Sequence, residues 1–397
     1  MSQRLFTRVT GVAVALGASV ALAACGSSAG SASSSSSPAA DTSSTAASSS
    51  ATAAAASGDS GSASTGSSAA VSAPIGVSGK KIALLLPESK TARYEAFDRP
   101  MFEAAIKAAC ADCTVLYSNA NQDSAQQQQQ AEAAITQGAN VLVLDAVDGK
   151  AAQTIVTAAK AKNVPVIAYD RFVAGTDFYV SFDNEKVGEL QGQGLVAAMK
   201  ANGKTSGDIV MINGSPTDAN AADFKAGAHK VLDSSGYKIV AEYDTPDWSP
   251  DKAQAFMESK VATVKSGLVG VYAANDGTAG GVITALKAGG VNPLPPVTGQ
   301  DAELAAIQRI LAGDQALTIY KAIKPEAETA ALAALQLASG AKVTATGTHQ
   351  GVPSTLLNPV VVTKSNIKDT VVKDNFYTVA QICTANFAGA CSAAGLS

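Results

Sequence analysis

Residues 140–145 read NVLVLD, residues 151–162 read AAQTIVTAAKAK and residues 164–169 read VPVIAY. The first and last runs are mostly apolar and have the length of strands, whereas the run between them has the length and composition of a helix. Strands that are apolar along their whole length are typical of a parallel sheet covered by helices on both faces. This stretch therefore predicts a strand–helix–strand unit of an α/β fold.

The same alternation extends on both sides of this stretch. Before it, we expect strands at 81–86 and 114–118 and helices at 94–109 and 122–137. After it the pattern begins again, with strands at 208–213, 237–243, 268–273 and 296–299 and helices near 186–200, 218–234, 251–264 and 278–288. Two successive parallel sheets predict two doubly wound lobes. Ligands of such sheets bind beyond the carboxyl ends of the strands, so we expect a site in the cleft between the lobes.

The first 25 residues have the character of an export signal. Arg4 and Arg8 precede an apolar run at 11–24 that is too short for a comfortable transmembrane span. The run ends in the residues LAAC at 22–25, which resemble the lipobox of bacterial lipoproteins. We therefore expect a signal peptide at 1–24, acylation of Cys25 and anchoring on the outer face of the cytoplasmic membrane. The alternative is an ordinary signal peptide in which Cys25 has no role.

Composition separates a tether from a folded body. Residues 26–78 are almost entirely Ser, Ala, Gly and Thr, which cannot bury enough apolar surface to fold. We expect residues 25–79 to form a lipidated, disordered linker, and the chain from residue 80 onward to fold. The net charge of −4 without a basic block gives no nucleic-acid footprint. His229 and His349 lack ligand spacing with the cysteines, so no metal site is expected, and no cofactor motif is present.

Four cysteines remain after Cys25, in two local pairs. They are Cys110, Cys113, Cys383 and Cys391. An even number of cysteines in an exported chain predicts disulfides within each pair. The C-x-x-C spacing of Cys110 and Cys113 also matches redox-active motifs, although the surrounding sequence is not thioredoxin-like.

Polar and charged side chains follow many of the predicted strands. They include Arg93, Tyr94, Asp170, Arg171, Trp248, Asn275, Asp301 and Lys321. Such a set suits a monosaccharide, because Arg and Lys donate hydrogen bonds, Asp accepts them, Asn does both, and an aromatic ring covers the C–H face. Each residue also has a structural interpretation: Asp301 or Asn275 as a helix N-cap, Asp170 and Arg171 as a surface ion pair, and Trp248 as a core residue.

Several longer segments resemble bacterial D-xylose-binding proteins. They are residues 169–171 (YDR), 177–191 (DFYVSFDNEKVGELQ), 214–221 (GSPTDANA), 275–281 (NDGTAGG), 299–304 (GQDAEL) and 366–371 (NIKDTV). The wider relatives are ribose and galactose binders with the type I periplasmic-binding fold. The resemblance implies two lobes joined by three crossovers, one formed by 80–182 plus 322–357 and the other by 183–321 plus 358–397.

The resemblance also implies a set of sugar contacts. The matching positions are Asp170, Arg171, Asn220, Trp248, Asn275, Asp301 and Lys321, with Arg93 and Tyr94 where the family has an Arg–aromatic pair. Residues 87–92 depart from the acidic, Arg-containing loop of the family, which leaves the exact sugar open among xylose, glucose and related aldoses. Lys90 lies in this departing loop and is an additional candidate contact.

The implied function is that of a monomeric, lipid-anchored binding protein that delivers a monosaccharide to an ABC permease. A receptor that feeds a chemotaxis or sensor-kinase system is the alternative. An enzyme is not expected, because Asp170 and Asp301 lie beside cationic residues that would keep both ionised, and no catalytic motif is present. A sugar-responsive repressor would need a DNA-binding module where the signal and linker stand.

Overall fold

A seven-stranded sheet forms the core of the first half of the folded chain. The computed structural model describes residues 76–396, which all fall within one compact unit. The strand order is β10-β11-β5-β4-β3-β1-β2, and every neighbouring pair is parallel except β10 and β11. The strands are β1 (Lys81–Leu86), β2 (Thr114–Asn119), β3 (Val141–Leu144), β4 (Val166–Tyr169), β5 (Phe178–Phe182), β10 (Gly347–His349) and β11 (Val352–Leu357).

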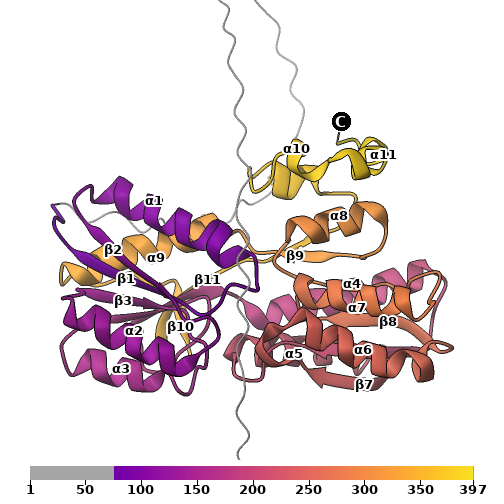
Figure 1. Ribbon diagram of the computed structural model, residues 1–397, viewed down its shortest axis with the longest axis horizontal. Helices are drawn as coiled ribbons and strands as arrows, with labels where there is room; N and C mark the ends of the chain where they lie inside the picture. The colour runs from indigo at the N-terminus through magenta and orange to yellow at the C-terminus, as the bar shows by residue number, and fades with distance from the viewer. Residues whose placement is uncertain (1–75, 397) are drawn as a thin grey trace, which may run out of the picture. The chain divides into compact units, whose positions relative to one another are not determined.

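Helices cover both faces of this sheet, as its fully apolar strands predict. One face packs against α1 (Arg99–Ala109) and α9 (Ile323–Ala338), and the other packs against α2 (Ser124–Thr136) and α3 (Gln153–Lys160) (Figure 1). A short π-helical turn, η1 (Tyr94–Asp98), precedes α1. We call this part of the molecule the N-terminal lobe.

A three-stranded parallel sheet lies at the centre of the second half, in the order β7-β6-β8. Its strands are β6 (Asp208–Asn213), β7 (Lys238–Asp244) and β8 (Leu268–Ala273). Two helices pack on each face: α4 (Asn184–Ala201) and α5 (Ala219–Leu232) on one, α6 (Pro250–Val264) and α7 (Asp276–Ala288) on the other. We call this part, together with residues 296–320 and 360–396, the C-terminal lobe.

The predicted strand at 296–299 forms only an isolated parallel bridge, between Val297 and Val271. Pro295 and Pro296 precede the bridge, and proline has no N–H group to donate to a ladder. Beyond this point lie α8 (Leu304–Ala312) and β9 (Thr318–Tyr320), which pairs antiparallel with β12 (Val360–Val362).

The chain ends in short helical turns that pack on α8. They are η3 (Lys368–Val372), α10 (Val379–Ile382), η4 (Ala385–Phe387) and α11 (Ala388–Ala393). We call residues 364–396 the C-terminal segment. Among the residues that the structure describes, none of the helices combines the length and apolar character needed to cross a bilayer.

The chain passes between the lobes three times. It leaves the seven-stranded sheet after β5, returns to it through α9 and β11, and leaves it again before β12. The fold is therefore the two-lobed α/β arrangement expected from the sequence. The expected signal peptide at 1–24, the acylated Cys25 and most of the linker at 25–79 lie outside the described residues.

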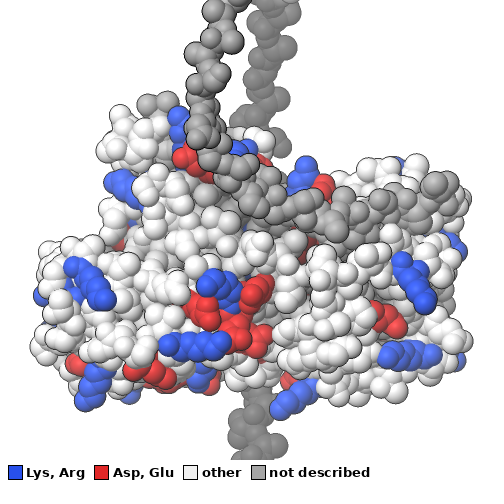
Figure 2. All heavy atoms as spheres, turned by 180° about the vertical axis from the view of Figure 1, so that it is seen from behind, with Lys and Arg blue, Asp and Glu red and all other residues white. Residues whose placement is uncertain are grey.

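Charged side chains are mixed over the face drawn in Figure 2, with one group in which acidic and basic side chains meet. Exposed ion pairs such as Lys186–Glu189, whose side chains are 44% and 25% exposed, contribute little to stability. The charges with the largest energetic effect are instead those that the fold buries.

Candidate ligand-binding site

A pocket walled by buried side chains lies where loops of the two lobes meet. It is lined by Thr91, Arg93, Tyr94, Asp170, Arg171, Asp218, Asn220, Phe224, Trp248, Asn275, Gln300, Asp301 and Lys321. Nine of the ten contact residues predicted from the sequence are in this set. The structure thus brings together residues from separate loops and turns that follow strands in both lobes.

Lys90 is the exception, because its side chain is exposed and does not line the pocket. Glu88 turns inward from the same loop and is fully buried. Its carboxylate accepts hydrogen bonds from the backbone N–H groups of Lys90 and Thr91, the latter at 3.0 Å. The loop therefore folds around Glu88, and the structure does not support Lys90 as a ligand contact.

Arg93 is held by carboxylates on several sides. It is 2% exposed, and its guanidinium donates to Asp98 at 2.9 and 2.6 Å, to Glu326 at 2.7 Å and to Asp170 at 3.1 Å. Asp98 lies one turn away in η1, and Glu326 lies in the first turn of α9. The side chain thus has one fixed orientation, which is what a donor to a small ligand requires.

Asp170 stays ionised despite its burial. Burial alone would raise its pKa, but the nearby cations Arg93, Lys321 and Arg171 outweigh this effect and hold the pKa at about 2. The hydroxyl of Tyr94 donates to the same carboxylate at 3.1 Å. Asp170 is therefore a hydrogen-bond acceptor throughout the physiological pH range.

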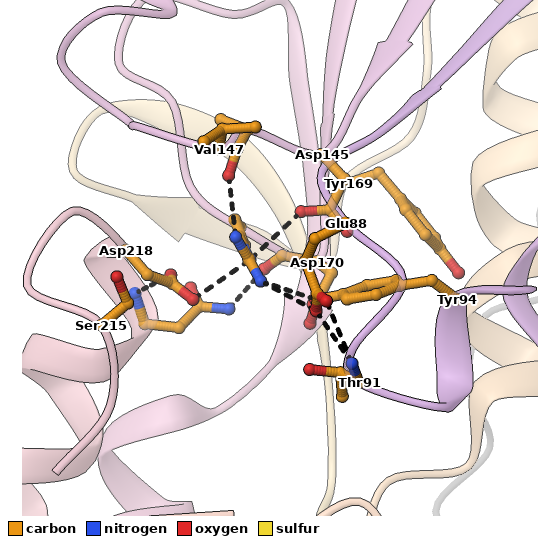
Figure 3. Close-up of polar contacts among 12 residues, drawn as sticks. Glu88, Thr91, Tyr94, Asp145, Val147, Tyr169, Asp170, Ser215 and Asp218 are labelled. Atoms are coloured by element: carbon orange, nitrogen blue, oxygen red, sulfur yellow. Dashed lines mark hydrogen bonds and ion pairs between the residues drawn. The ribbon is translucent and has the colours of Figure 1, made fainter. Parts of the chain in front are cut away.

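Arg171 connects the two lobes. Its Nε lies 3.1 Å from the carboxylate of Asp218, in the C-terminal lobe, and 3.5 Å from that of Asp145, at the end of β3 in the N-terminal lobe. Glu88, Asp145 and Asp218 approach this position from three directions (Figure 3). Burial raises the pKa of Asp145 and of Asp218, while the Arg171 charge opposes both shifts. Arg171 and Asp170 do not form the surface ion pair considered above, since both are buried.

Lys321 links carboxylates from both lobes. Its Nζ lies 3.0 Å from Asp301 and 3.8 Å from Asp170, and it follows directly after β9, at a crossing between the lobes. Asp301 is not the N-cap of α8, a position that Glu303 occupies. Asn275 both lines the pocket and caps α7, where its side chain accepts from the N–H of Thr278 at 2.9 Å.

Trp248 forms an apolar wall of the pocket. Its indole is 4% exposed, and its Nε1 donates to Asp218 at 3.0 Å. Gly214 leaves room for the ring, because a Cβ atom there would lie 2.1 Å from the indole. Asn220 lies nearby and donates through Nδ2 to the carbonyl oxygen of Asp170 at 2.9 Å.

Three pocket residues have left-handed backbone conformations. The φ angles are 54° for Asp170, 53° for Trp248 and 86° for Asp301. Such angles are rare for residues other than glycine, and they persist where surrounding contacts fix them, most often at functional sites. These strained backbone conformations therefore indicate that the three side chains have a functional role.

Several residues of the site were not among the contacts predicted from the sequence. Phe224 and Gln300 line the pocket, and the signal for both was local: Phe224 follows Asn220 by one helical turn, and Gln300 precedes Asp301. Glu326 and Asp98 gave no such signal, because their burial depends on how α9 and η1 pack.

Both expected disulfides are present, Cys110–Cys113 and Cys383–Cys391. Among residues 76–396, the one cluster with the spacing of a metal site is Cys110, Asp112 and Cys113. Its two sulfur atoms are already bonded to each other, so they cannot act as thiolate ligands there.

Comparison with known proteins places this architecture in a family. Residues 82–342 match the family model described as periplasmic binding protein domain. The chain belongs to this family of periplasmic binding proteins. It is 39% identical to the D-xylose-binding periplasmic protein of Escherichia coli (strain K12), over 76% of this chain and 92% of that protein. It is also 39% identical to the D-xylose-binding periplasmic protein of Haemophilus influenzae, over 75% and 90% of the two chains.

The fold of this periplasmic binding protein also matches solved structures. An ABC transporter solute-binding protein from Clostridium phytofermentans, with bound β-D-glucose, superimposes with a TM-score of 0.70 at 28% identity, over 76% of this chain and all of that one. The protein is thus a solute-binding receptor and not an enzyme.

Proposed function

We propose that this binding protein captures a neutral monosaccharide, D-xylose or a related aldose, in the buried pocket between its lobes and delivers it to an ABC importer. The observation that carries the proposal is that every cation lining the pocket already has a carboxylate partner there. Arg93 lies 3.1 Å from Asp170, Arg171 lies 3.1 Å from Asp218, and Lys321 lies 3.0 Å from Asp301. A charged ligand would leave one member of this set unpaired, whereas a neutral one disturbs no pair.

The geometry of the pocket also favours a sugar over other neutral molecules. Hydroxyl groups both donate and accept, so they can bridge the carboxylates and the cations that face each other across the pocket. Trp248 and Phe224 supply apolar surface for the C–H face of a ring. Relatives named as D-xylose-binding proteins and a structural neighbour with bound β-D-glucose support aldoses as the ligand class.

A thermal-shift panel of aldoses tests this function. The full-length protein is mixed separately with D-xylose, D-glucose, D-ribose, D-galactose and L-arabinose. A ligand at 100 times its Kd stabilises the folded state by about 2.7 kcal/mol, which is a clear rise in Tm. We expect the largest rise with D-xylose or D-glucose. If none of the aldoses raises the Tm, while a charged ligand such as a sugar phosphate or an amino acid does, the proposal is contradicted.

Recovery of the bound ligand separates binding from catalysis. Isotopically labelled D-xylose or D-glucose, incubated with the protein and then released by denaturation, is expected to return unchanged. A second labelled product would contradict the assignment as a receptor.

We further propose that the protein acts as a monomer held at the outer face of the cytoplasmic membrane by a lipid on Cys25. The lobe limits that we propose are 80–182 plus 322–357 and 183–321 plus 358–397. The support for the anchor is the LAAC sequence at 22–25, followed by a polar linker.

Substitution of the anchor residue tests this part of the proposal. Cys25→Ser is expected to move the protein from the membrane fraction to the soluble extracytoplasmic fraction, with sugar binding unchanged. Retention of the variant in the membrane fraction would show that Cys25 is not the anchor.

A further inference from the structure

An aromatic cluster outside the pocket joins the two lobes. Phe97, in η1 of the N-terminal lobe, stacks on Phe376 of the C-terminal segment, with ring centroids 4.1 Å apart and an interplanar angle of 22°. The same ring meets Tyr377 edge-on at 5.6 Å. Phe376 and Tyr377 are each 6% exposed. We call Phe97, Phe376 and Tyr377 the aromatic clasp.

The clasp lies directly behind two walls of the pocket. On one side, Phe97 follows Tyr94 by three residues in the same helical turn, and Tyr94 lines the pocket. On the other side, the ring of Phe376 lies 5.2 Å from that of Tyr320, the residue before Lys321. Movement of either ring would therefore displace a segment that carries a pocket side chain.

Apolar packing reinforces the junction at the same place. Leu304, at the start of α8, packs against the hydrophobic cluster that contains Phe376 and Tyr377, and Phe97 packs against the same cluster from η1. The start of α8 and the clasp thus share one buried cluster.

The C-terminal segment is itself fixed to the C-terminal lobe. The disulfide Cys383–Cys391 closes its last turns, and Gln308 of α8 donates to the carbonyl oxygen of Ile382 at 3.2 Å. Phe376 and Tyr377 therefore belong to the C-terminal lobe, whereas Phe97 lies in η1, which leads directly into α1 of the N-terminal lobe.

We propose that Phe97, Phe376 and Tyr377 are positioning residues for sugar binding, which hold the Arg93–Tyr94 wall against the C-terminal lobe while the pocket is closed. This inference rests on the proposed function. The clasp touches no pocket space, so its loss does not remove a contact with the sugar. Its effect is on how long the closed pocket persists, and therefore on the dissociation rate of the ligand.

The experiment compares two aromatic stacks in the full-length protein. Phe376→Ala removes the interlobe stack. Phe256→Ala removes the stack of Phe256 on Tyr243 (centroids 4.5 Å apart, 5° between planes), which lies within the C-terminal lobe and away from the pocket. Dissociation of D-xylose, and of D-glucose as a second probe, is followed by stopped-flow fluorescence of Trp248, the single tryptophan of the chain.

We expect both variants to lower the Tm, and Phe376→Ala alone to raise the dissociation rate constant. The rise is about tenfold, which corresponds to about 1.4 kcal/mol and matches the usual size of an aromatic pair. The association rate constant changes little. Phe97→Leu, which keeps apolar volume but removes the stack, is expected to shift the dissociation rate in the same direction, and it provides the test if Phe376→Ala does not fold.

Unchanged dissociation rates in Phe376→Ala and Phe97→Leu, with normal sugar binding by the wild type, would overturn the role of the clasp and leave the proposed function intact. An equal rise in Phe256→Ala would also overturn it, because general destabilisation would then explain the effect. A wild-type protein that binds neither probe would instead contradict the proposed function itself.

Discussion

Arg171 shows how a single side chain can serve both lobes at once. Its guanidinium has carboxylate partners from the loops after β3 and β6, and it is 3% exposed. Removal of one partner from a buried ion pair leaves an uncompensated charge, which costs more than the pair itself contributes. The same reasoning applies to Asp301, the nearest partner of Lys321.

We therefore expect Arg171→Ala and Asp301→Ala each to reduce sugar affinity by at least about a hundredfold, on the order of the 2–5 kcal/mol that a broken buried charge pair costs. The fold should survive, because both residues lie at the lobe junction and outside the apolar cores. Isothermal titration calorimetry measures the affinity, and circular dichroism checks the fold. Wild-type affinity in both variants would show that the pocket has been assigned wrongly.

Trp248 supplies the largest apolar side chain of the pocket. Replacement by alanine should weaken sugar binding by about 1–3 kcal/mol, because ring contact and buried area are lost. Trp248→Phe separates two effects: it keeps an aromatic face but loses the Nε1 donor to Asp218. We expect an intermediate affinity for this variant by calorimetry. Equal affinities of Trp248→Ala and the wild type would place the indole outside the binding contact.

Residue patterns predicted much of this site, and the reason is topological. The carboxyl ends of parallel strands lie at one edge of their sheet. Asp170, Asn275 and Asp301 follow predicted strands, so the sequence alone was enough to assign them to one site. Asp145 ends the predicted strand at 140–145 and carried the same signal without being singled out, whereas Glu326 could not be found this way. Glu326 looks like an ordinary surface residue of a helix, and only the packing of α9 against the sheet buries it. Lys90 was misplaced because the sequence does not reveal that Glu88 takes the inner side of the same turn.

Among the elements, α4 and α5 approach each other closely at two glycines. A Cβ atom on Gly188 would lie 2.0 Å from the carbonyl oxygen of Phe224, a contact that the helices cannot accept without moving apart. On the facing helix, a Cβ atom on Gly227 would lie 2.0 Å from the carbonyl oxygen of Glu185. Helix pairs with such close backbones have little freedom to adjust, because protein interiors are tightly packed.

Gly188→Ala is therefore expected to destabilise the protein by about 2 kcal/mol or more, as measured by urea denaturation. Gly389→Ala is the matched control, since Gly389 lies in α11 with nothing near its added Cβ atom. The control should be neutral or slightly stabilising, because alanine favours a helix over glycine. Similar losses in both variants would argue against the close approach as the cause.

The N-terminus of α7 carries a carboxyl group with an unusual pKa. Burial raises the pKa of Asp276 to about 7, although Arg309 and hydrogen bonds from Gln315 and Thr318 act in the opposite direction. In the unfolded chain this group titrates near pH ~4. Between these values the folded state holds a proton that the unfolded state has lost, so the free energy of unfolding falls as pH rises.

We expect the stability of the wild type to decline on the order of 2 kcal/mol between about pH 5 and pH 8, and that of Asp276→Asn to decline less. The amide of the variant cannot titrate, so the difference in slope, rather than the absolute stability, is the informative quantity. Urea denaturation at several pH values measures it. Parallel slopes for the two proteins would assign the pH dependence to other groups.

At the scale of elements, the alternation of apolar runs was sufficient to place most strands and helices, including β1, β3, β4 and α4 to α7. The strand at 296–299 was overpredicted, since prolines interrupt its ladder. The strands β5, β10 and β11 were not identified, because they lie at one side of the sheet, where residues such as Tyr179, Ser181 and Ser354 break the apolar pattern.

For the whole molecule, the two lobes meet through directional polar contacts as well as through the aromatic clasp. Besides Arg171–Asp218, Gln122 donates to the carbonyl oxygen of Asp247 at 3.1 Å, and Gly149 donates to that of Thr217 at 3.2 Å. Junctions of this kind are compatible with hinge opening, because water can replace each hydrogen bond when the lobes separate.

The pairing of β11 with β5 has a consequence for the order in which the chain can fold. Residues 352–357 complete the sheet that residues 81–86 begin, and the whole β6–β9 region lies between them in the sequence. When the chain is made from its N-terminus, the edge of β5 stays unpaired until β11 has been synthesised, near the end of the sequence. Such long-range pairing slows folding and prolongs the exposure of an aggregation-prone strand edge. Conditions that keep newly made chains apart until β11 has paired would therefore limit aggregation during folding.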